Sequence, residues 1–304
     1  MKKVLITGVS GMLGGNLARF LNDLYVVEGW YHSYPVRIPG VLTSTCDMEN
    51  SGAVASSIQA VRPDVVIHCA ARIDVDRMEE DRDASWNMNV VATENLVSVL
   101  APETQLVHIS TDAVYGGTTG NYSERMKNNP KNWYGQTKLE AEHLVARHAN
   151  SLILRVNFYG WNRYGKMSLA EWFISKFEAG KSFGGFGDAI FSPLYTMDLG
   201  RIIDECIEGG VTGTYNCCSR DSISKLEFGR KIAKLFGYPL ELLKEISIDD
   251  MATMVPRGKN LSMSVAKLEG ALKHQLPTVD ESLSHFKADY GTAVAEKLGS
   301  SIPE

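Results

Sequence analysis

Residues 3–14 of this chain read KVLITGVSGMLG, a short apolar run followed by glycines at three-residue intervals. The run predicts a strand over Lys3–Thr7, and the glycines predict a tight turn into a helix over Leu13–Leu24. Such a turn brings the backbone close to a bound pyrophosphate and directs free helix amides at it. The spacing GxxGxxG differs from the commoner GxGxxG and also fits a purely structural turn. Its place directly after the first strand favours dinucleotide binding.

Strand-like and helix-like stretches alternate through the first half of the chain. Further strands are predicted at Tyr25–Tyr31, Asp64–His68, Leu106–Ser110 and Ser151–Val156, and helices at Ser51–Val61, Ser85–Leu100 and Trp133–His148. Several strand runs are continuously apolar, as in strands covered on both faces. The alternation predicts an α/β fold built on a Rossmann-type, doubly wound parallel sheet.

The regular alternation ends near residue 157, and glycine-rich stretches follow at 180–187 and 209–213. We expect a dinucleotide-binding Rossmann domain over residues 1–160. A smaller α/β domain, mainly for substrate, is expected over residues 161–304, with some segments returning to the Rossmann core. No linker rich in Pro or Ser separates the two parts, so we expect them to pack together.

Composition and charge exclude several classes of protein. The 304 residues are 44% hydrophobic and 22% charged, which is typical of a globular chain rather than a disordered one. The net charge of -5 without a basic cluster argues against nucleic acid as a partner. No apolar run reaches the roughly 20 residues of a membrane span, and the apolar start is too short for a signal peptide. We therefore expect a cytoplasmic protein without a membrane partner. The five cysteines form no metal-type CxxC pair, so reduced thiols and no metal site are predicted.

The end of the second predicted strand bears on the choice of cofactor. An acid at this position would favour NAD by binding the ribose 2′-hydroxyl. Here His32 and Ser33 follow the strand, with Arg37 nearby. Imidazole, hydroxyl and guanidinium groups suit a 2′-phosphate better, so NADPH is predicted, with NADH as the alternative. Asp47 and Met48 are candidates to flank the adenine.

A catalytic pair is predicted on the helix that begins near residue 133. Tyr134 and Lys138 are four residues apart and so share one helix face. A neighbouring ammonium is expected to lower the tyrosine pKa, and the pair suits carbonyl reduction with a nicotinamide. Thr111 ends a predicted strand at the edge of the sheet where ligands bind in such folds, so its hydroxyl is expected beside the substrate oxygen.

These residues together resemble the extended short-chain dehydrogenase/reductase family, and within it the dTDP-4-dehydrorhamnose reductases. The resemblance covers most of the chain and includes residues 110–116 (STDAVYG), 134–138 (YGQTK), 192–199 (SPLYTMDL) and 257–260 (RGKN). It implies a Thr–Tyr–Lys triad, a sugar-nucleotide substrate and a homodimer. The resulting expectation is an NADPH-dependent reductase of a nucleotide-linked 4-keto-6-deoxysugar.

The resemblance and the residue patterns together give two sets of candidate contacts. Cofactor contacts are expected from Gly8, Ser10, Gly11, Met12, Leu13, Gly14, His32, Ser33, Arg37, Asp47, Met48, Cys69, Ala70, Ala71, Arg72, Asn89, Tyr134 and Lys138. Substrate contacts are expected from Thr111, Asp112, Ala113, Asn157, Arg257 and Lys259. Arg155 fits either the floor of the substrate site or a structural ion pair.

Two other functions remain open from the sequence. A non-catalytic dinucleotide-binding subunit is one, as in the regulatory β subunit of methionine adenosyltransferase, although the complete triad argues against it. A sugar-nucleotide epimerase with a retained cofactor is the other. Dehydration is disfavoured because Asp112 is followed by Ala113 rather than by the acid of the sugar-nucleotide dehydratases.

Overall fold

The computed structural model describes residues 1–162, 167–251 and 255–291. At its centre lies a parallel seven-stranded sheet with the strand order β11-β6-β5-β4-β1-β2-β3. Its strands are β1 (Lys3–Thr7), β2 (Val26–Tyr31), β3 (Leu42–Thr45), β4 (Val65–His68), β5 (Gln105–Thr111), β6 (Ser151–Val156) and β11 (Gly213–Cys217). The order reverses beside β1, which creates a ligand crevice at the carboxyl ends of the strands. The predicted Rossmann-type α/β fold is confirmed.

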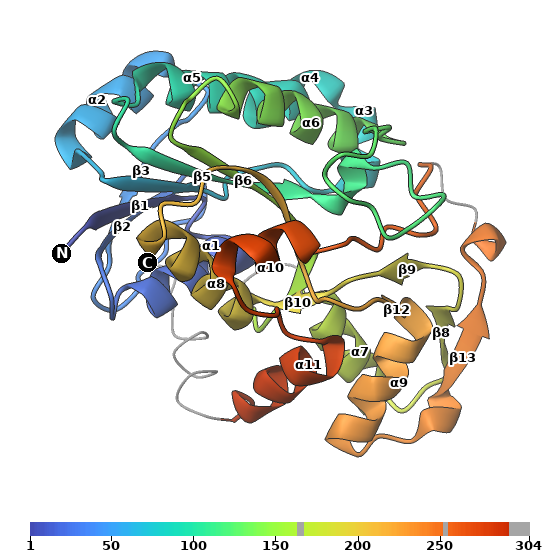
Figure 1. Cartoon of the computed structure of the whole chain (residues 1–304). Helices are drawn as coiled ribbons and strands as arrows, with labels where there is room; N and C mark the ends of the chain where they lie inside the picture. Colours follow the sequence, from blue (N-terminus) through green and yellow to red (C-terminus); the bar gives the residue numbers. More distant parts are fainter. Residues whose placement is uncertain (163–166, 252–254, 292–304) are drawn as a thin grey trace.

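Helices cover both faces of this sheet (Figure 1). One face carries α2 (Ser51–Val61), α5 (Ala92–Val99) and α6 (Trp133–Val145), and the other carries α1 (Met12–Leu21) and α8 (Thr196–Glu208). Two-sided cover explains why the strands are so apolar: every residue of β4 and of β5 is buried.

In the first 160 residues, the predicted elements differ from the observed ones mainly at their ends and at one strand, whereas no strand is predicted in the second half, where β11 joins the sheet. The strand β3 has no counterpart among the predicted strands, because its sequence LTST is short, polar and largely exposed at the sheet edge. Helix α1 ends at Leu21 rather than Leu24, and α6 ends at Val145 rather than His148. Element ends are the least reliable part of such a prediction.

The helix predicted over Ser85–Leu100 is not continuous. It consists of α4 (Arg82–Trp86), a π-helical turn η1 (Asn87–Val91) and α5. A π-turn holds one residue more than an α-turn and is not signalled by apolar periodicity. In this turn Asn89 is buried and hydrogen-bonds with the backbone of Arg72 and the hydroxyl of Thr137, so the irregular turn positions a polar side chain.

A second core, rich in aromatic side chains such as Phe173, Phe228 and Phe286, lies in the C-terminal half of the chain. It is formed mainly by β7 (Phe158–Tyr159), α7 (Leu169–Glu178), β8 (Phe183–Phe186), β9 (Ile190–Phe191), β10 (Leu194–Tyr195), β12 (Ile223–Ser224), α9 (Lys225–Phe236), η3 (Leu240–Leu242), β13 (Leu243–Ile246) and α11 (Val279–Ala288). The other elements lie elsewhere: α3 (Val75–Glu80) packs on α4 and α6, η2 (Asp112–Val114) on α6, and α10 (Ala266–Leu272) on β11, while η4 (Ile248–Asp250) follows β13. Within the described ranges, none of the helices combines the length and the apolar character needed to cross a bilayer.

A buried ion pair joins helix α6 to the sheet. The Arg155 guanidinium on β6 donates to both carboxylate oxygens of Glu142, at 2.6 Å for the shortest contact, and to the Tyr115 hydroxyl at 2.8 Å. Both side chains of the pair are 5% exposed. The Ser110 hydroxyl on β5 also donates to Glu142. Of the two readings that the sequence left for Arg155, the structure shows the ion pair.

Removing one partner of this pair is expected to destabilise the fold strongly. Arg155→Met leaves the Glu142 carboxylate buried without its main donor, which costs about 3–5 kcal/mol of unfolding free energy. The double variant Arg155→Met/Glu142→Leu removes both charges and is expected to recover most of that loss. Urea unfolding measures both.

The exposed pair Lys231–Asp280 provides the control, because Lys231→Met is expected to change the unfolding free energy by less than about 1 kcal/mol. A double variant no more stable than Arg155→Met would contradict the prediction.

Candidate active site

One continuous cavity of about 1150 Å³ lies along the carboxyl ends of the central strands. It begins at the glycine turn after β1, passes the ends of β4, β5 and β6, and reaches β9 and the start of α9. The cavity therefore brings both halves of the chain to one site, as expected for a crevice at a switch point of an α/β sheet.

The glycine turn is built so tightly that side chains do not fit. Gly8 has a φ of +72°, and a Cβ there would lie 2.8 Å from the backbone of Ala70. A Cβ on Gly14 would lie 2.4 Å from the carbonyl oxygen of Gly8. No side chain caps α1 at Gly11, and its first turn carries no acid, so the first amides stay available to an anion. Gly8, Ser10, Gly11, Met12, Leu13 and Gly14 all line the cavity. These features fit the pyrophosphate of a dinucleotide.

The next part of the cavity is the predicted adenosine end. His32, Ser33, Asp47 and Met48 line it, and the Ser33 hydroxyl lies 3.0 Å from Nδ1 of His32. Arg37 does not line the cavity and is exposed to solvent. The chain turns away after Val36, and a position near His32 in sequence does not place Arg37 near it in space.

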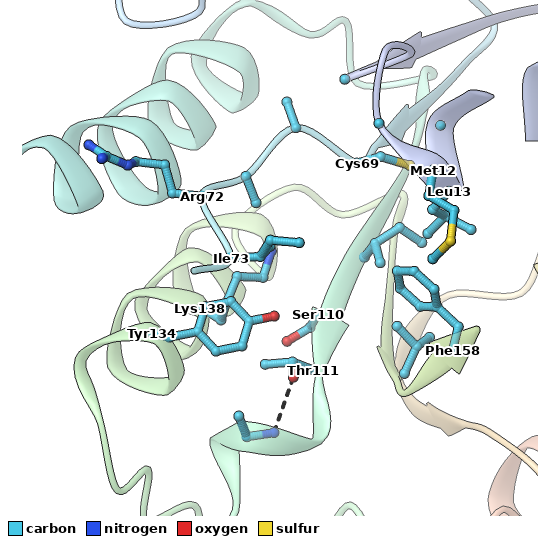
Figure 2. Close-up of a pocket in the computed structure, with 18 of the residues that line it drawn as sticks. Met12, Leu13, Cys69, Arg72, Ile73, Ser110, Thr111, Tyr134, Lys138 and Phe158 are labelled. Atoms are coloured by element: carbon cyan, nitrogen blue, oxygen red, sulfur yellow. Dashed lines mark hydrogen bonds between the residues drawn. The ribbon is translucent and has the colours of Figure 1, made fainter. Parts of the chain in front are cut away.

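The segment after β4 forms the middle of the cavity wall. Cys69, Ala70, Ala71 and Arg72 line it, but the Arg72 guanidinium points away from the catalytic side chains (Figure 2) and donates to Asp81 at 3.3 Å. Asn89 does not line the cavity. Its side-chain amide instead accepts from the backbone amide of Arg72 at 2.7 Å and donates to the Arg72 carbonyl at 3.0 Å. Asn89 thus holds the cavity wall from behind.

The three predicted catalytic side chains meet at the cavity centre. Figure 2 shows the Tyr134 hydroxyl directed toward Ser110 and Thr111, with Lys138 beside the tyrosine ring. The Thr111 oxygen accepts from the amide of Ala113 at 3.2 Å and donates to Asp112 at 3.1 Å, which fixes the hydroxyl at the cavity. The arrangement can hold a carbonyl oxygen and give it a proton.

Burial dominates the ionisation of Tyr134. Although the Thr111 hydroxyl lowers it, burial raises the pKa of Tyr134 to about 12. The expectation that Lys138 depresses this pKa is therefore wrong here, because the loss of hydration outweighs nearby favourable groups. At neutral pH the phenol keeps its proton, which suits a proton donor.

Lys138 has a partner that the sequence analysis did not find. Burial lowers the pKa of Lys138 to about 8. Its ammonium lies 3.3 Å from Nε2 of His108, a fully buried residue of β5. Burial and the Lys138 charge hold the pKa of His108 well below its usual range, so the ring is neutral and accepts from the lysine. The two residues are 30 positions apart on different elements, and no local pattern signals the contact.

The far end of the cavity contains the predicted substrate side. Asp112, Ala113, Asn157 and Arg257 line it, and the Asn157 amide donates to Asp112 at 2.6 Å. Lys259 lies outside the lining and forms ion pairs with Asp188 and Asp249. Two lysines that the sequence analysis passed over, Lys131 and Lys225, line the cavity instead.

Loss of the His108 acceptor is expected to lower the Lys138 pKa further. His108→Leu removes a hydrogen bond to a buried ammonium, which is equivalent to roughly one pH unit or more. His108→Gln keeps an acceptor and is expected to retain a pKa near that of the parent. NMR titration of isotope-labelled lysine side chains measures both. Equal Lys138 pKa values in the leucine and glutamine variants would contradict the assigned role.

Comparisons with known proteins agree with this geometry. Residues 1–291 match the family described as RmlD substrate binding domain. The probable low-salt glycan biosynthesis reductase Agl14 of Haloferax volcanii is 29% identical, with 94% of this chain and 97% of the relative covered. The methionine adenosyltransferase 2 subunit beta of Danio rerio is 28% identical, with 88% of this chain and 84% of the relative covered.

A solved structure shares the whole architecture. The dTDP-4-dehydrorhamnose reductase of Bacillus anthracis, solved in complex with NADP, superposes with a TM-score of 0.86 at 28% identity, covering 95% of this chain and 99% of that chain. The resemblance to extended short-chain dehydrogenases/reductases is confirmed. With the family match spanning nearly all of its length, this chain belongs to the RmlD substrate-binding domain family.

Proposed function

We propose that this chain is an NADPH-dependent reductase of a nucleotide-linked 4-keto-6-deoxysugar. One observation carries the proposal: Thr111, Tyr134 and Lys138 line the same cavity that begins at the glycine turn. The turn would hold the pyrophosphate of a dinucleotide in the cavity that the triad lines. The similarity to a dTDP-4-dehydrorhamnose reductase and to a glycan biosynthesis reductase supports the substrate class.

The cofactor site fits NADPH by its donors and its space. The amides of the first turn of α1 are available for the pyrophosphate, and His32 and Ser33 are available for a 2′-phosphate. Lys138 is placed to hold the nicotinamide ribose. The related structure from Bacillus anthracis contains NADP, which supports NADPH over the alternative NADH.

NADPH supplies the hydride for carbonyl reduction when it is bound. Tyr134 donates its phenolic proton to the keto oxygen, and the Thr111 hydroxyl holds that oxygen in place. The ammonium of Lys138 lies beside the tyrosine ring, where it would hold the nicotinamide ribose, and His108 fixes the lysine by accepting one of its hydrogens.

The two halves of the chain line different parts of this cavity. We propose that residues 1–160 bind the cofactor and that residues 161–304 mainly bind the sugar nucleotide, with β11 returned to the sheet. Residues of β9 and α9 at the far end of the cavity support this division. A homodimer is part of the proposal on family resemblance.

A non-catalytic dinucleotide-binding subunit is the second candidate, favoured by the similarity to the methionine adenosyltransferase subunit. The complete triad supports the enzyme instead. Tight NADPH binding with no turnover of any nucleotide-linked keto-sugar would favour the subunit.

Replacement of the proton donor gives the direct test. Tyr134→Phe is expected to reduce kcat roughly 10²- to 10⁴-fold because it removes general-acid catalysis without changing the fold. The dissociation constant of NADPH is expected to stay close to that of the parent. NADPH oxidation with a dTDP-4-keto-6-deoxysugar and cofactor fluorescence measure the two effects. Tyr290→Phe, at an exposed tyrosine away from the cavity lining, serves as the control. Equal kcat in Tyr134→Phe and the parent would refute the mechanism.

The pH dependence of reduction is expected to follow Lys138. Below pH about 8 the lysine is charged, and above it the charge is lost as the amine deprotonates. Because Tyr134, with a pKa of about 12, keeps its proton throughout, kcat/KM should stay level up to about pH 8 and then fall through one ionisation. Initial rates between pH 6 and 10 measure this profile, and constant rates to pH 10 would contradict it.

A further inference from the structure

Lys225 enters the cavity from the C-terminal half of the chain. It is the first residue of α9 and lines the far end of the cavity together with Phe191, Asp112 and Arg257. This end lies opposite the glycine turn along the cavity, so a group bound there does not belong to the proposed NADPH pyrophosphate.

The Lys225 ammonium has no partner of opposite charge in direct contact. It makes no hydrogen bond or ion pair with any residue in the described parts of the chain, and the nearest aromatic face, Phe186, has its ring centroid 5.9 Å away. By contrast, Lys259 has two carboxylate partners and Arg257 pairs with Asp76 at 3.0 Å. Lys225 is thus a partly buried cation that folding leaves without an anion.

The electrostatic surroundings of Lys225 disfavour its charged form as long as no anion is bound beside it. Burial and the charge of Arg257 lower the pKa of Lys225, and only Asp112 acts in the opposite direction. Asp112 is itself occupied, because Asn157 donates to it and Thr111 lies beside it. Beside the unpaired Lys225, Arg257 uses only one nitrogen in its exposed pair with Asp76, so its other donors can join Lys225 in holding an anion with more than one charge. A diphosphate matches both charges and spans neighbouring donors.

We propose that Lys225 binds the diphosphate of the nucleotide-sugar substrate, with Arg257 beside it. The inference rests on the proposed function, because that function supplies a substrate with a diphosphate. It assigns to Lys225 the phosphate contact that the sequence pattern had assigned to Lys259.

Binding of nucleoside diphosphates tests the inference without any turnover. The full-length protein is first saturated with NADP⁺, so that the cofactor site is closed to the probes. Calorimetry then gives dissociation constants for dTDP, UDP and GDP and for the corresponding nucleosides. Lys225→Met is expected to weaken the best-bound diphosphate at least roughly tenfold and to leave its nucleoside unchanged.

Two further variants separate charge at this position from charge elsewhere on the helix. Lys225→Arg is expected to keep most of the affinity, and Lys234→Met, which removes an exposed lysine of the same helix, is expected to bind as the parent does. Lys225→Met is also expected to melt at a higher temperature than the parent without ligands, because it removes a partly buried, unpaired charge. A raised melting temperature with weakened binding excludes misfolding as the cause.

The outcomes distinguish this inference from the proposed function. If the parent reduces a nucleotide-linked keto-sugar and Lys225→Met binds the diphosphate as tightly as the parent, the inference is overturned and the function stands. If the parent binds none of the three diphosphates and reduces no nucleotide-linked keto-sugar, both fail. A loss of affinity for the nucleoside as large as that for the diphosphate also overturns the inference.

Discussion

The candidate site depends on the buried contact between Glu142 and Arg155. Glu142 follows Lys138 by four residues and Tyr134 by eight, so all three lie along one face of α6. Arg155 holds that face against β6, and Ser110, which also donates to Glu142, directly precedes Thr111 on β5. One ion pair therefore fixes the distance between the helix that carries the tyrosine and the strand that carries the threonine. The ion pair takes no part in the proposed reaction, but it sets the relative positions of Tyr134 and Thr111.

The second constraint is the dry interior beneath the site. His68 and His108 are fully or almost fully buried, and His68 is held by the hydroxyls of Thr7 and Thr93 at 2.7 Å and 3.0 Å. Burial lowers the pKa of His68 to about 3, so both rings remain neutral. Neutral imidazole rings are stable in an interior without water, whereas Lys138 needs a hydrogen-bond acceptor such as His108 to keep its charge there. Low polarity strengthens each electrostatic contact at the site, and it also reverses the expected direction of the Tyr134 shift.

The parts that the sequence predicted are those encoded locally. The glycine turn, the buried strands and the pair Tyr134–Lys138 each lie within a short stretch, and the sheet topology then follows from general rules. The contact of His108 with Lys138 joins β5 to α6, and the sequence around neither residue indicates it. Lys225 and Lys259 look alike in sequence, and the difference between them is that Asp188 and Asp249 neutralise only Lys259. Arg37 lies outside the cavity lining although it is near His32 in sequence, because proximity along a loop says little about the direction of the chain.

The π-turn at Asn87–Val91 limits how the sequence around this site can change in evolution. Such a turn arises when one residue is inserted into an α-helix, and each residue of an α-helix turns the chain by about 100°. Deleting a single codon here would rotate Asn89 and everything before it relative to Leu96, whose side chain is buried in the core. Point substitutions can be tested by selection one at a time, but loss of this insertion would displace the wall beside Arg72 and the helix packing together. The irregular turn is therefore a feature that descendants of this chain can keep or lose only as a unit.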